Sequence, residues 1–144
     1  MKKAFTMIEL IFVIVIIGIL SAVAVPKFTA TRDDAFHSRA RGTVSAVRNA
    51  LAIERQKRVL RGDFTEITDL SAAGGTKIFT TFSADKAGKY NSILEYPLKS
   101  GTKIGSWNKV GSLYIYHYGA SASCDYNLTS NKFTVVSSCS VLGD

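Results

Sequence analysis

The sequence predicts an α+β protein in which one long N-terminal helix packs on a small antiparallel sheet. Two observations support this prediction. An apolar run gives way to an amphipathic helical pattern, and the second half of the chain has β-branched and aromatic stretches between turn-forming residues. The expected segments are a short basic start at 1–4, an apolar half-helix at 5–25, an amphipathic half-helix at 26–62 and a β-rich head at 63–144.

The apolar run is long enough to cross a membrane. It covers 21 residues from Phe5 to Val25, and Glu9 is its only charge. At about 1.5 Å per residue, such a helix matches the roughly 30 Å hydrocarbon core of a bilayer. A carboxylate inside a bilayer costs about 3 kcal/mol on insertion scales and is usually paired and functional. The sequence therefore predicts a neutralising partner for Glu9.

After Pro26 the pattern predicts an amphipathic helix. Apolar residues recur at steps of 4, 4, 3 and 4, at Phe36, Ala40, Val44, Val47 and Leu51. The arginines are predicted to fall largely off this stripe, at Arg39, Arg41, Arg48, Arg55 and Arg58. Gly62 follows a basic last turn, so the helix is expected to run from about Phe5 to Arg61. Pro26 removes one backbone hydrogen bond and is expected to kink it.

The net charge of +7 is concentrated on one segment. Residues 27–62 hold nine basic and three acidic side chains, and they include every arginine of the chain. Residues 63–144 hold seven basic and seven acidic side chains, so their charges cancel. A basic helix is typical of nucleic-acid binding. Here the arginines are expected to pair with Asp33, Asp34, Glu54 or acidic groups of neighbouring molecules, which leaves direct DNA contact as the minor alternative.

Four strands are predicted in the head, over 77–82, 92–98, 112–118 and 132–138. A loop is expected at 71–75, between the helix and the sheet.

The predicted third strand has two distinct faces. Alternation places Leu113, Ile115 and His117 on one of them and Tyr114, Tyr116 and Tyr118 on the other, and one face should lie on the helix. The tyrosine face is expected to pack under a loop, with glycan or surface binding as the less favoured alternative.

The cysteines favour a disulfide, and the remaining motifs give catalysis little support. Cys124 and Cys139 are separated by 14 residues, which fits neither a zinc pattern nor a C-x-x-C redox motif. In a chain that enters a membrane, a disulfide worth about 3 kcal/mol is favoured over two buried thiols. The two histidines, His37 and His117, belong to no catalytic motif. We expect no enzyme, no metal and no cofactor.

The N-terminus admits three interpretations. Lys2, Lys3 and the small residues near Ala24 are typical of a secretory signal peptide, so that the mature chain would begin near Val25. A plain membrane anchor with the lysines in the cytoplasm is the second interpretation. Neither gives Glu9 a role.

The third interpretation gives Glu9 a role. The residues KKAFTMIEL, followed by an apolar helix and Pro26, resemble the type IV pilin family, which includes the pseudopilins of type II secretion and competence systems. The resemblance implies that a prepilin peptidase cuts between Ala4 and Phe5 and that Phe5 is then N-methylated. The sequence departs from the family pattern at Ala4, where glycine is usual, and at Met7, where leucine is common.

The resemblance also implies a partner for Glu9. Cleavage creates a positive amine at Phe5, and in the family the glutamate answers the amine of a neighbouring subunit. Opposite charges 4 Å apart attract by about 4 kcal/mol at an effective dielectric of 20, before desolvation. This attraction is close to the cost of placing the carboxylate in the bilayer. The pair of Glu9 and the amine is therefore expected to fix the register between helices more than to add stability. The resemblance also implies that the stretch from Gly18 to Pro26 extends in filaments, with a static kink as the alternative.

The implied function is a structural subunit of a helical homo-oligomeric filament with the pilin fold. The resemblance implies a single-pass protein of the bacterial inner membrane that later joins a cell-surface pilus or a periplasmic pseudopilus. Its implied partners are the prepilin peptidase, an inner-membrane assembly platform and minor pilins. A pseudopilin for secretion or DNA uptake is the alternative, and a small secreted binding protein is a further one; the cysteine pair favours the pilin.

Asn127 is a candidate glycosylation site. It begins an N-x-[ST] sequon, and Asp125 stands two residues before it, which is the extended form that bacterial oligosaccharyltransferases prefer.

Overall fold

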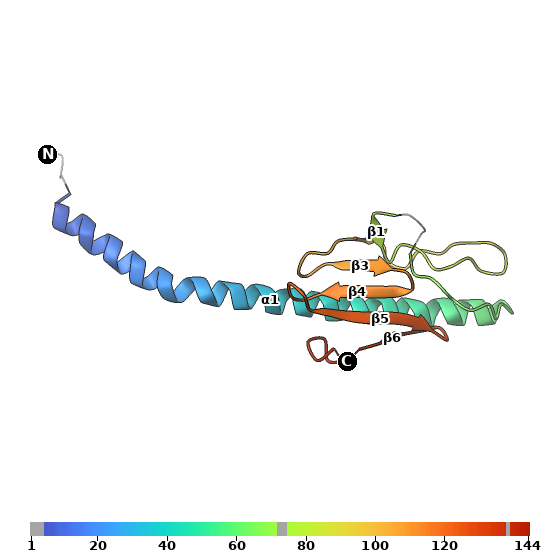
Figure 1. Cartoon of the computed structure of the whole chain (residues 1–144). Coiled ribbons are helices and arrows are strands. Elements are labelled where there is room, and N and C mark those ends of the chain that lie inside the picture. Colours follow the sequence, from blue (N-terminus) through green and yellow to red (C-terminus); the bar gives the residue numbers. More distant parts are fainter. Residues whose placement is uncertain (1–4, 72–74, 138) are drawn as a thin grey trace. The chain divides into compact units, whose positions relative to one another are not determined.

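The computed structural model describes residues 5–71, 75–137 and 139–144 (Figure 1). The expected leader Met1–Ala4, the middle of the expected loop 71–75 and Ser138 lie outside the described residues. The chain forms two compact units, divided between Ala35 and Phe36. We call them the N-terminal unit and the head.

One helix, α1, spans Met7–Leu60, which confirms the predicted long helix. It continues through Pro26. Its end at Gly62 follows the Schellman pattern: the N–H of Gly62 donates to Val59 O at 2.9 Å, and the N–H of Asp63 donates to Arg58 O at 2.9 Å. Gly62 has a φ of 71°, a conformation that glycine adopts without the strain of a Cβ.

The head contains two antiparallel sheets. A two-stranded sheet pairs β1 (Lys77–Ile78) with β2 (Leu98–Lys99). The larger sheet has the order β3-β4-β5-β6, in which each strand pairs with the next one in the sequence. Its strands are β3 (Trp107–Val110), β4 (Leu113–His117), β5 (Ser123–Thr129) and β6 (Lys132–Val135). The larger sheet runs along the part of α1 that belongs to the head (Figure 1).

The predicted α+β class is confirmed, but several strand predictions were wrong. β3 and β5 were not predicted. The expected strand 77–82 ends after Ile78 because Phe79 adopts a φ of 57°, which turns the backbone out of the extended region. The expected strand 92–98 is reduced to an isolated bridge at Ser92 and the start of β2 at Leu98. Only the β4 prediction agrees closely with the structure.

The core lies between the larger sheet and α1. The helix buries the predicted stripe at Ala40, Val44, Val47 and Leu51, while Phe36 at its start is half-buried. The sheet contributes a cluster of aromatic rings, namely Trp107, Tyr114, Tyr116, Tyr126 and Phe133. Phe79 lies among these rings, stacked on Tyr114 with the ring centroids 5.5 Å apart.

The tyrosine face of β4 is therefore the core face. Tyr114 and Tyr116 are almost completely buried, and Tyr118 packs partly buried against the core. Burial removes these rings from any glycan or surface contact. The structure thus agrees with the packing interpretation and rules out the binding interpretation for Tyr114 and Tyr116.

The prediction for Arg58 was wrong. Its side chain is fully buried and donates to Glu54, with Nε and Oε1 3.0 Å apart. Arg58 also donates to the backbone carbonyls of Ser83 and Ala84, and Asn91 donates to Glu54 at 2.9 Å. The buried face of α1 therefore continues past Leu51 as a polar layer that ties the segment 83–91 to the helix.

Asp63 makes a fold contact that depends on pH. Its carboxylate accepts the backbone N–H of Lys86, the hydroxyl of Thr65 and the N–H of Thr65, and these hydrogen bonds, that of Lys86 first, lower its pKa to about 2. Because the pKa is lower in the folded chain than the ordinary value of 3.8, the resulting stability is complete above about pH 4 and is lost as the pH falls to 2.

We therefore expect the melting temperature of the full chain in detergent to fall between pH 4 and pH 2, and to fall less steeply in Asp63→Asn. Thermal melts of both proteins at four or five pH values check this. Glu66→Gln, which alters an exposed carboxyl nearby, is the control and should follow the unaltered chain. Parallel pH profiles for Asp63→Asn and the unaltered chain would contradict the assignment.

Candidate functional site

The N-terminal end of α1 is closed by a capping box. Thr6 precedes the helix, and its Oγ1 accepts the N–H of Glu9 at 3.3 Å. In return Glu9 Oε2 accepts the N–H of Thr6 at 3.3 Å and its hydroxyl at 3.1 Å. The pattern T-x-x-E before an apolar run is the sequence signature of this motif. The prediction of a helix from Phe5 overlooked it.

The capping box supplies Glu9 with hydrogen-bond donors inside its own chain. Glu9 also lies in the first turn of α1, where the partial positive charge of the helix dipole favours a carboxylate. Phe5 lies before the helix and is 78% exposed. The residues that follow the predicted cleavage point are therefore outside the helix and accessible, while Ala4 lies outside the described residues.

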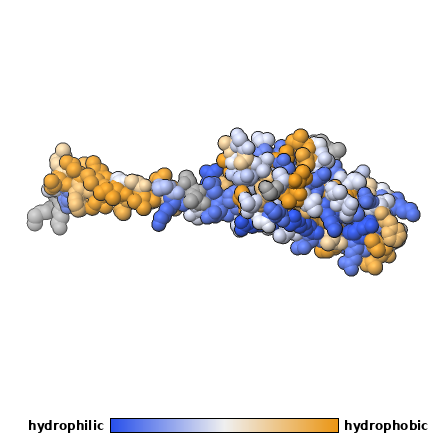
Figure 2. Space-filling model, turned by 60° about the horizontal axis from the view of Figure 1, so that its bottom comes forward, coloured by the Kyte–Doolittle hydropathy of each residue, from blue (hydrophilic) through white to orange (hydrophobic). Residues whose placement is uncertain are grey.

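The first half of α1 presents a continuous apolar surface. By length and composition α1 can cross a membrane, with a mean hydropathy of 3.0 over its best window and none of that window buried. Figure 2 shows hydrophobic residues over nearly the whole visible surface of this segment. Exposed apolar area of this extent marks a membrane or protein contact.

The two residues predicted to bound an extensible stretch, Gly18 and Pro26, both lie within α1. A Cβ added at Gly18 would have no atom within 4 Å. The helix is continuous between them in this structure, and their extension in a filament stays a prediction.

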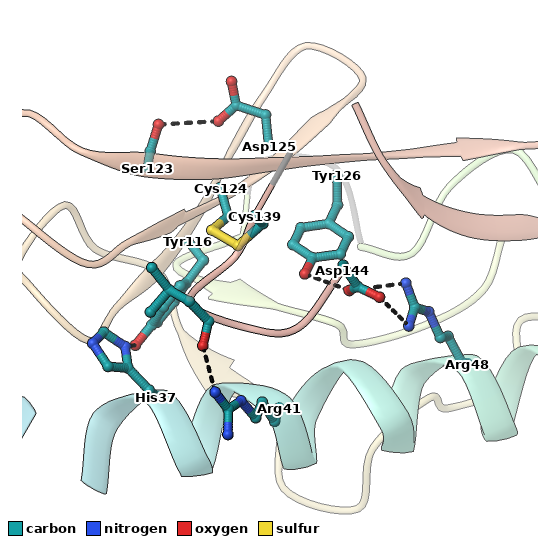
Figure 3. Close-up of a disulfide and its surroundings, with 11 residues drawn as sticks. His37, Arg41, Arg48, Tyr116, Ser123, Cys124, Asp125, Tyr126, Cys139 and Asp144 are labelled. Carbon is teal, nitrogen blue, oxygen red and sulfur yellow. Dashed lines mark hydrogen bonds and ion pairs between the residues drawn. A yellow bond between two sulfur atoms is a disulfide. The ribbon is translucent and has the colours of Figure 1, made fainter. Parts of the chain in front are cut away.

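A disulfide joins Cys124 and Cys139, as the sequence favours, with the Cα atoms 5.5 Å apart. Cys124 lies in β5, so the bridge attaches the segment 139–144 to the sheet (Figure 3). Two arginines of α1 hold the same segment. Arg41 donates to Val141 O at 2.8 Å, and Arg48 forms two hydrogen bonds of 3.0 and 3.1 Å with the carboxylate of Asp144.

Tyr126 completes this arrangement, which we call the tail clamp: the disulfide, Arg41, Arg48, Tyr126 and Asp144. The hydroxyl of Tyr126 donates to Asp144 at 2.8 Å (Figure 3). Burial acts to raise the pKa of Asp144, but the hydrogen bonds from Arg48 and Tyr126 outweigh it and lower the pKa. Burial, followed by the bond to Asp144, raises the pKa of Tyr126. The carboxylate and the phenol thus keep the ionisation states that the clamp needs at neutral pH.

Reducing the disulfide, or replacing both cysteines with serine, is expected to lower the free energy of unfolding by about 2–4 kcal/mol. Denaturant titration of the full chain in detergent measures the loss. Ser140→Ala, in the same segment, is the control and should change stability by less than about 0.5 kcal/mol. Equal stability of the oxidised and reduced chains would contradict the clamp's role in holding the segment.

The arginines of the head are largely engaged within it. Arg41, Arg48 and Arg58 make the contacts given above, Arg55 donates to Thr65 O at 3.2 Å, and Arg61 contacts Asp85 at 3.4 Å. These contacts agree with arginines that pair within the head, and direct contact with DNA stays the minor alternative. The predicted pairing with Glu54 is confirmed.

Asn127 lies in β5, which has β4 on one side and β6 on the other. Its side-chain oxygen accepts the N–H of Leu128 at 2.8 Å. Its side chain is half-buried, although the backbone of the strand is paired on both sides. Glycosylation of Asn127 stays a prediction.

Comparison with known proteins agrees with this geometry. Residues 1–25 match the family model described as the prokaryotic N-terminal methylation motif. The type IV narrow pilus major component PilA5 of Thermus thermophilus is 55% identical over 51 residues, which are 35% of this chain and 44% of that protein. Two fimbrial proteins of Pseudomonas aeruginosa are each 34% identical over 96 residues, 58% of this chain and 62% of theirs.

The chain thus spans between 44% and 62% of the length of these curated relatives. No solved structure matches the chain. A methylation motif, an exposed apolar half-helix and a sheet packed on the second half of the same helix define a class of membrane-anchored α+β proteins with a prepilin-type N-terminus. Within that class, the chain is similar to type IV pilins: the matched motif covers residues 1–25, and the relatives that it matches are a pilus component and two fimbrial proteins.

Proposed function

We propose that this chain is the precursor of a pilus subunit. A prepilin peptidase cuts it between Ala4 and Phe5, Phe5 is N-methylated, and the subunits polymerise through the helix segment 5–25. The observation that carries the proposal is the exposed apolar half of α1, headed by Glu9 and lying within the methylation motif. Catalysis has no part in this role.

In this proposal Glu9 fixes the register between the helices of neighbouring subunits. Cleavage places a positive amine on Phe5 of each subunit, and the carboxylate of Glu9 in an adjacent subunit accepts it. In the free chain this carboxylate accepts the N–H and hydroxyl of Thr6. Pairing with the amine replaces neutral donors with a charged one, and charge-assisted hydrogen bonds are roughly twice as strong as neutral ones. Helices shifted out of register lose this gain.

The proposed location follows from the anchor and the disulfide. Before assembly the chain crosses the inner membrane once, and the head lies on the oxidising side, where disulfides persist. An inner-membrane assembly platform and minor pilins are the proposed partners that add it to the filament.

A cell-surface pilus is favoured over a periplasmic pseudopilus. The relatives are named as a pilus component and as fimbrial proteins, and the head carries a disulfide. A pseudopilin of a secretion or DNA-uptake system is the second candidate.

N-terminal sequencing of the native protein tests the proposal. Methylated Phe5 as the first residue is the expected result, and a mature chain that starts at Val25 would overturn it. Electron microscopy with an antibody against the head should then find surface fibres that a deletion strain lacks. If the deletion strain instead keeps its fibres but loses secretion or transformation, the pseudopilin is the correct assignment.

A further inference from the structure

A groove of about 780 Å³ opens on the head beside the last turns of α1. Its apolar lining includes Ile53, Leu60, Phe82 and Ile93. Its cationic lining consists of Lys57, Arg61 and Lys89. Ile53 and Leu60 are 53% and 80% exposed, so the apolar wall is uncovered in the isolated head. The groove suits a partner that brings an apolar side chain together with a carboxylate.

The charges of the groove fall into two groups. Glu54 is paired with Arg58 and accepts a hydrogen bond from Asn91, and Arg61 lies within ion-pair distance of both Asp85 and Glu54. Lys57 and Lys89, in contrast, have no carboxylate within ion-pair distance in the described part of the chain. These two lysines are therefore the charges that an incoming carboxylate would meet.

The head itself carries a segment with the complementary chemistry. In the described sequence of the head, an exposed large apolar side chain stands within two residues of an exposed carboxylate at Tyr96, beside Glu95, and at Phe64, near Glu66. Tyr96 is 80% exposed, more than Phe64 at 70%. Pro97 follows it and biases the backbone of Tyr96 away from helical conformations, which reduces the backbone entropy that binding would cost. We call residues 95–97 the Tyr96 loop.

The Tyr96 loop does not fill the groove of its own head. Ser92 and Ile93 line the groove, whereas Tyr96, three residues further on, is largely exposed and not part of the lining. The loop of one copy is therefore free to reach the groove of another. Tyrosine is among the residues that most often dominate the binding energy of an interface, because a large ring and a hydroxyl bind together.

We propose that the groove of one head receives the Tyr96 loop of a second copy of this chain, with Tyr96 against Ile53 and Leu60 and Glu95 beside Lys57 and Lys89. This inference rests on the proposed function as a filament subunit. Groove and loop are different surfaces, so the contact is heterologous. Each added copy leaves one groove and one loop free, which is the condition for continued growth.

Cysteine cross-linking in isolated filaments tests the contact. In the variant Lys57→Cys/Tyr96→Cys both native cysteines remain in their disulfide, and a short bismaleimide should join neighbouring copies into a ladder of multimers. Each single variant, and the pair Lys103→Cys/Tyr96→Cys with its cysteine at an exposed site outside the groove, should give no ladder. Wild-type-like filaments without a ladder from the first pair would overturn this contact alone, and absence of filaments from the unaltered chain would overturn the proposed function as well.

Charge reversal gives an independent readout. Lys57→Glu/Lys89→Glu is expected to reduce filament yield about tenfold or more, because like charges would then face each other across the contact. Adding Glu95→Lys should restore most of the yield. Lys103→Glu is the matched control and should leave the yield unchanged. Failure of Glu95→Lys to restore filaments would overturn the pairing.

Discussion

Replacing Arg58 with alanine is expected to destabilise the head by about 3–5 kcal/mol. The substitution removes the closer cation of the buried Glu54, which then keeps only the distant contact with Arg61 at 3.9 Å, and it removes the donor that satisfies the carbonyls of Ser83 and Ala84. Small domains are stable by about 5–15 kcal/mol, so the variant is expected to be partly unfolded at growth temperature. Denaturant titration in detergent, followed by near-UV circular dichroism, measures the loss.

Two further variants show whether burial of the ion pair is the cause. Arg55→Ala removes a half-buried arginine that bonds a single carbonyl, and it should cost about 1 kcal/mol. The double variant Glu54→Met/Arg58→Met should be more stable than Arg58→Ala, because no buried charge is left unpaired. A loss for Arg58→Ala no larger than that for Arg55→Ala would contradict the role given to the pair.

Replacing Glu9 with alanine is expected to reduce filament number at least about tenfold while membrane insertion stays intact. Insertion should if anything improve, since a carboxylate in the bilayer costs about 3 kcal/mol on insertion scales. Assembly should fail because the amine of Phe5 in the adjoining subunit then lacks its acceptor. Membrane fractionation and counting of filaments by electron microscopy measure the two effects separately.

The capping box makes a sharper comparison available. Glu9→Gln keeps an oxygen that can accept the N–H of Thr6 but removes the charge, whereas Thr6→Val removes the hydroxyl of the box and keeps the charge. If the charge serves assembly, Glu9→Gln should resemble Glu9→Ala, and Thr6→Val should assemble nearly normally. Normal filaments in Glu9→Gln would contradict the role of the Glu9 charge in fixing the register between helices.

The long helix and one strand were predictable because their signals are local. Helical periodicity from Phe36 to Leu51 identifies the buried face, and strict alternation at 113–117 identifies β4. In β5 apolar residues also alternate, at Cys124, Tyr126 and Leu128, but the sequence prediction overlooked them. The strand contains Asp and Asn, which are depleted in strands, and it is held by pairing with β4 and β6. Its register is a property of the whole sheet.

Some features of the candidate site were also predictable from the sequence, and others were not. Glu9 stands out by composition alone, and its cap was readable from the spacing of Thr6 and Glu9. The burial of Arg58 was not readable from the sequence, because the backbone carbonyls that accept its hydrogen bonds lie 25 and 26 residues further along the chain. The backbone turn at Phe79 was also not predictable from the sequence. This bulky aromatic residue has a positive φ, and its contacts with the rings of Tyr114, Trp107 and Phe133 stabilise that conformation.

The reciprocal bonds between Thr6 and Glu9 bear on how subunits are stored and recycled. Under the proposed function, the carboxylate of a subunit that waits in the membrane already accepts two hydrogen bonds within its own chain, so it is not left without donors. Joining the fibre then exchanges one set of bonds for another, and leaving it restores the first set. The work that a motor must do on this contact is then the difference between the charged pair and the neutral bonds that replace it, which is less than the energy of separating the charged pair with nothing in exchange.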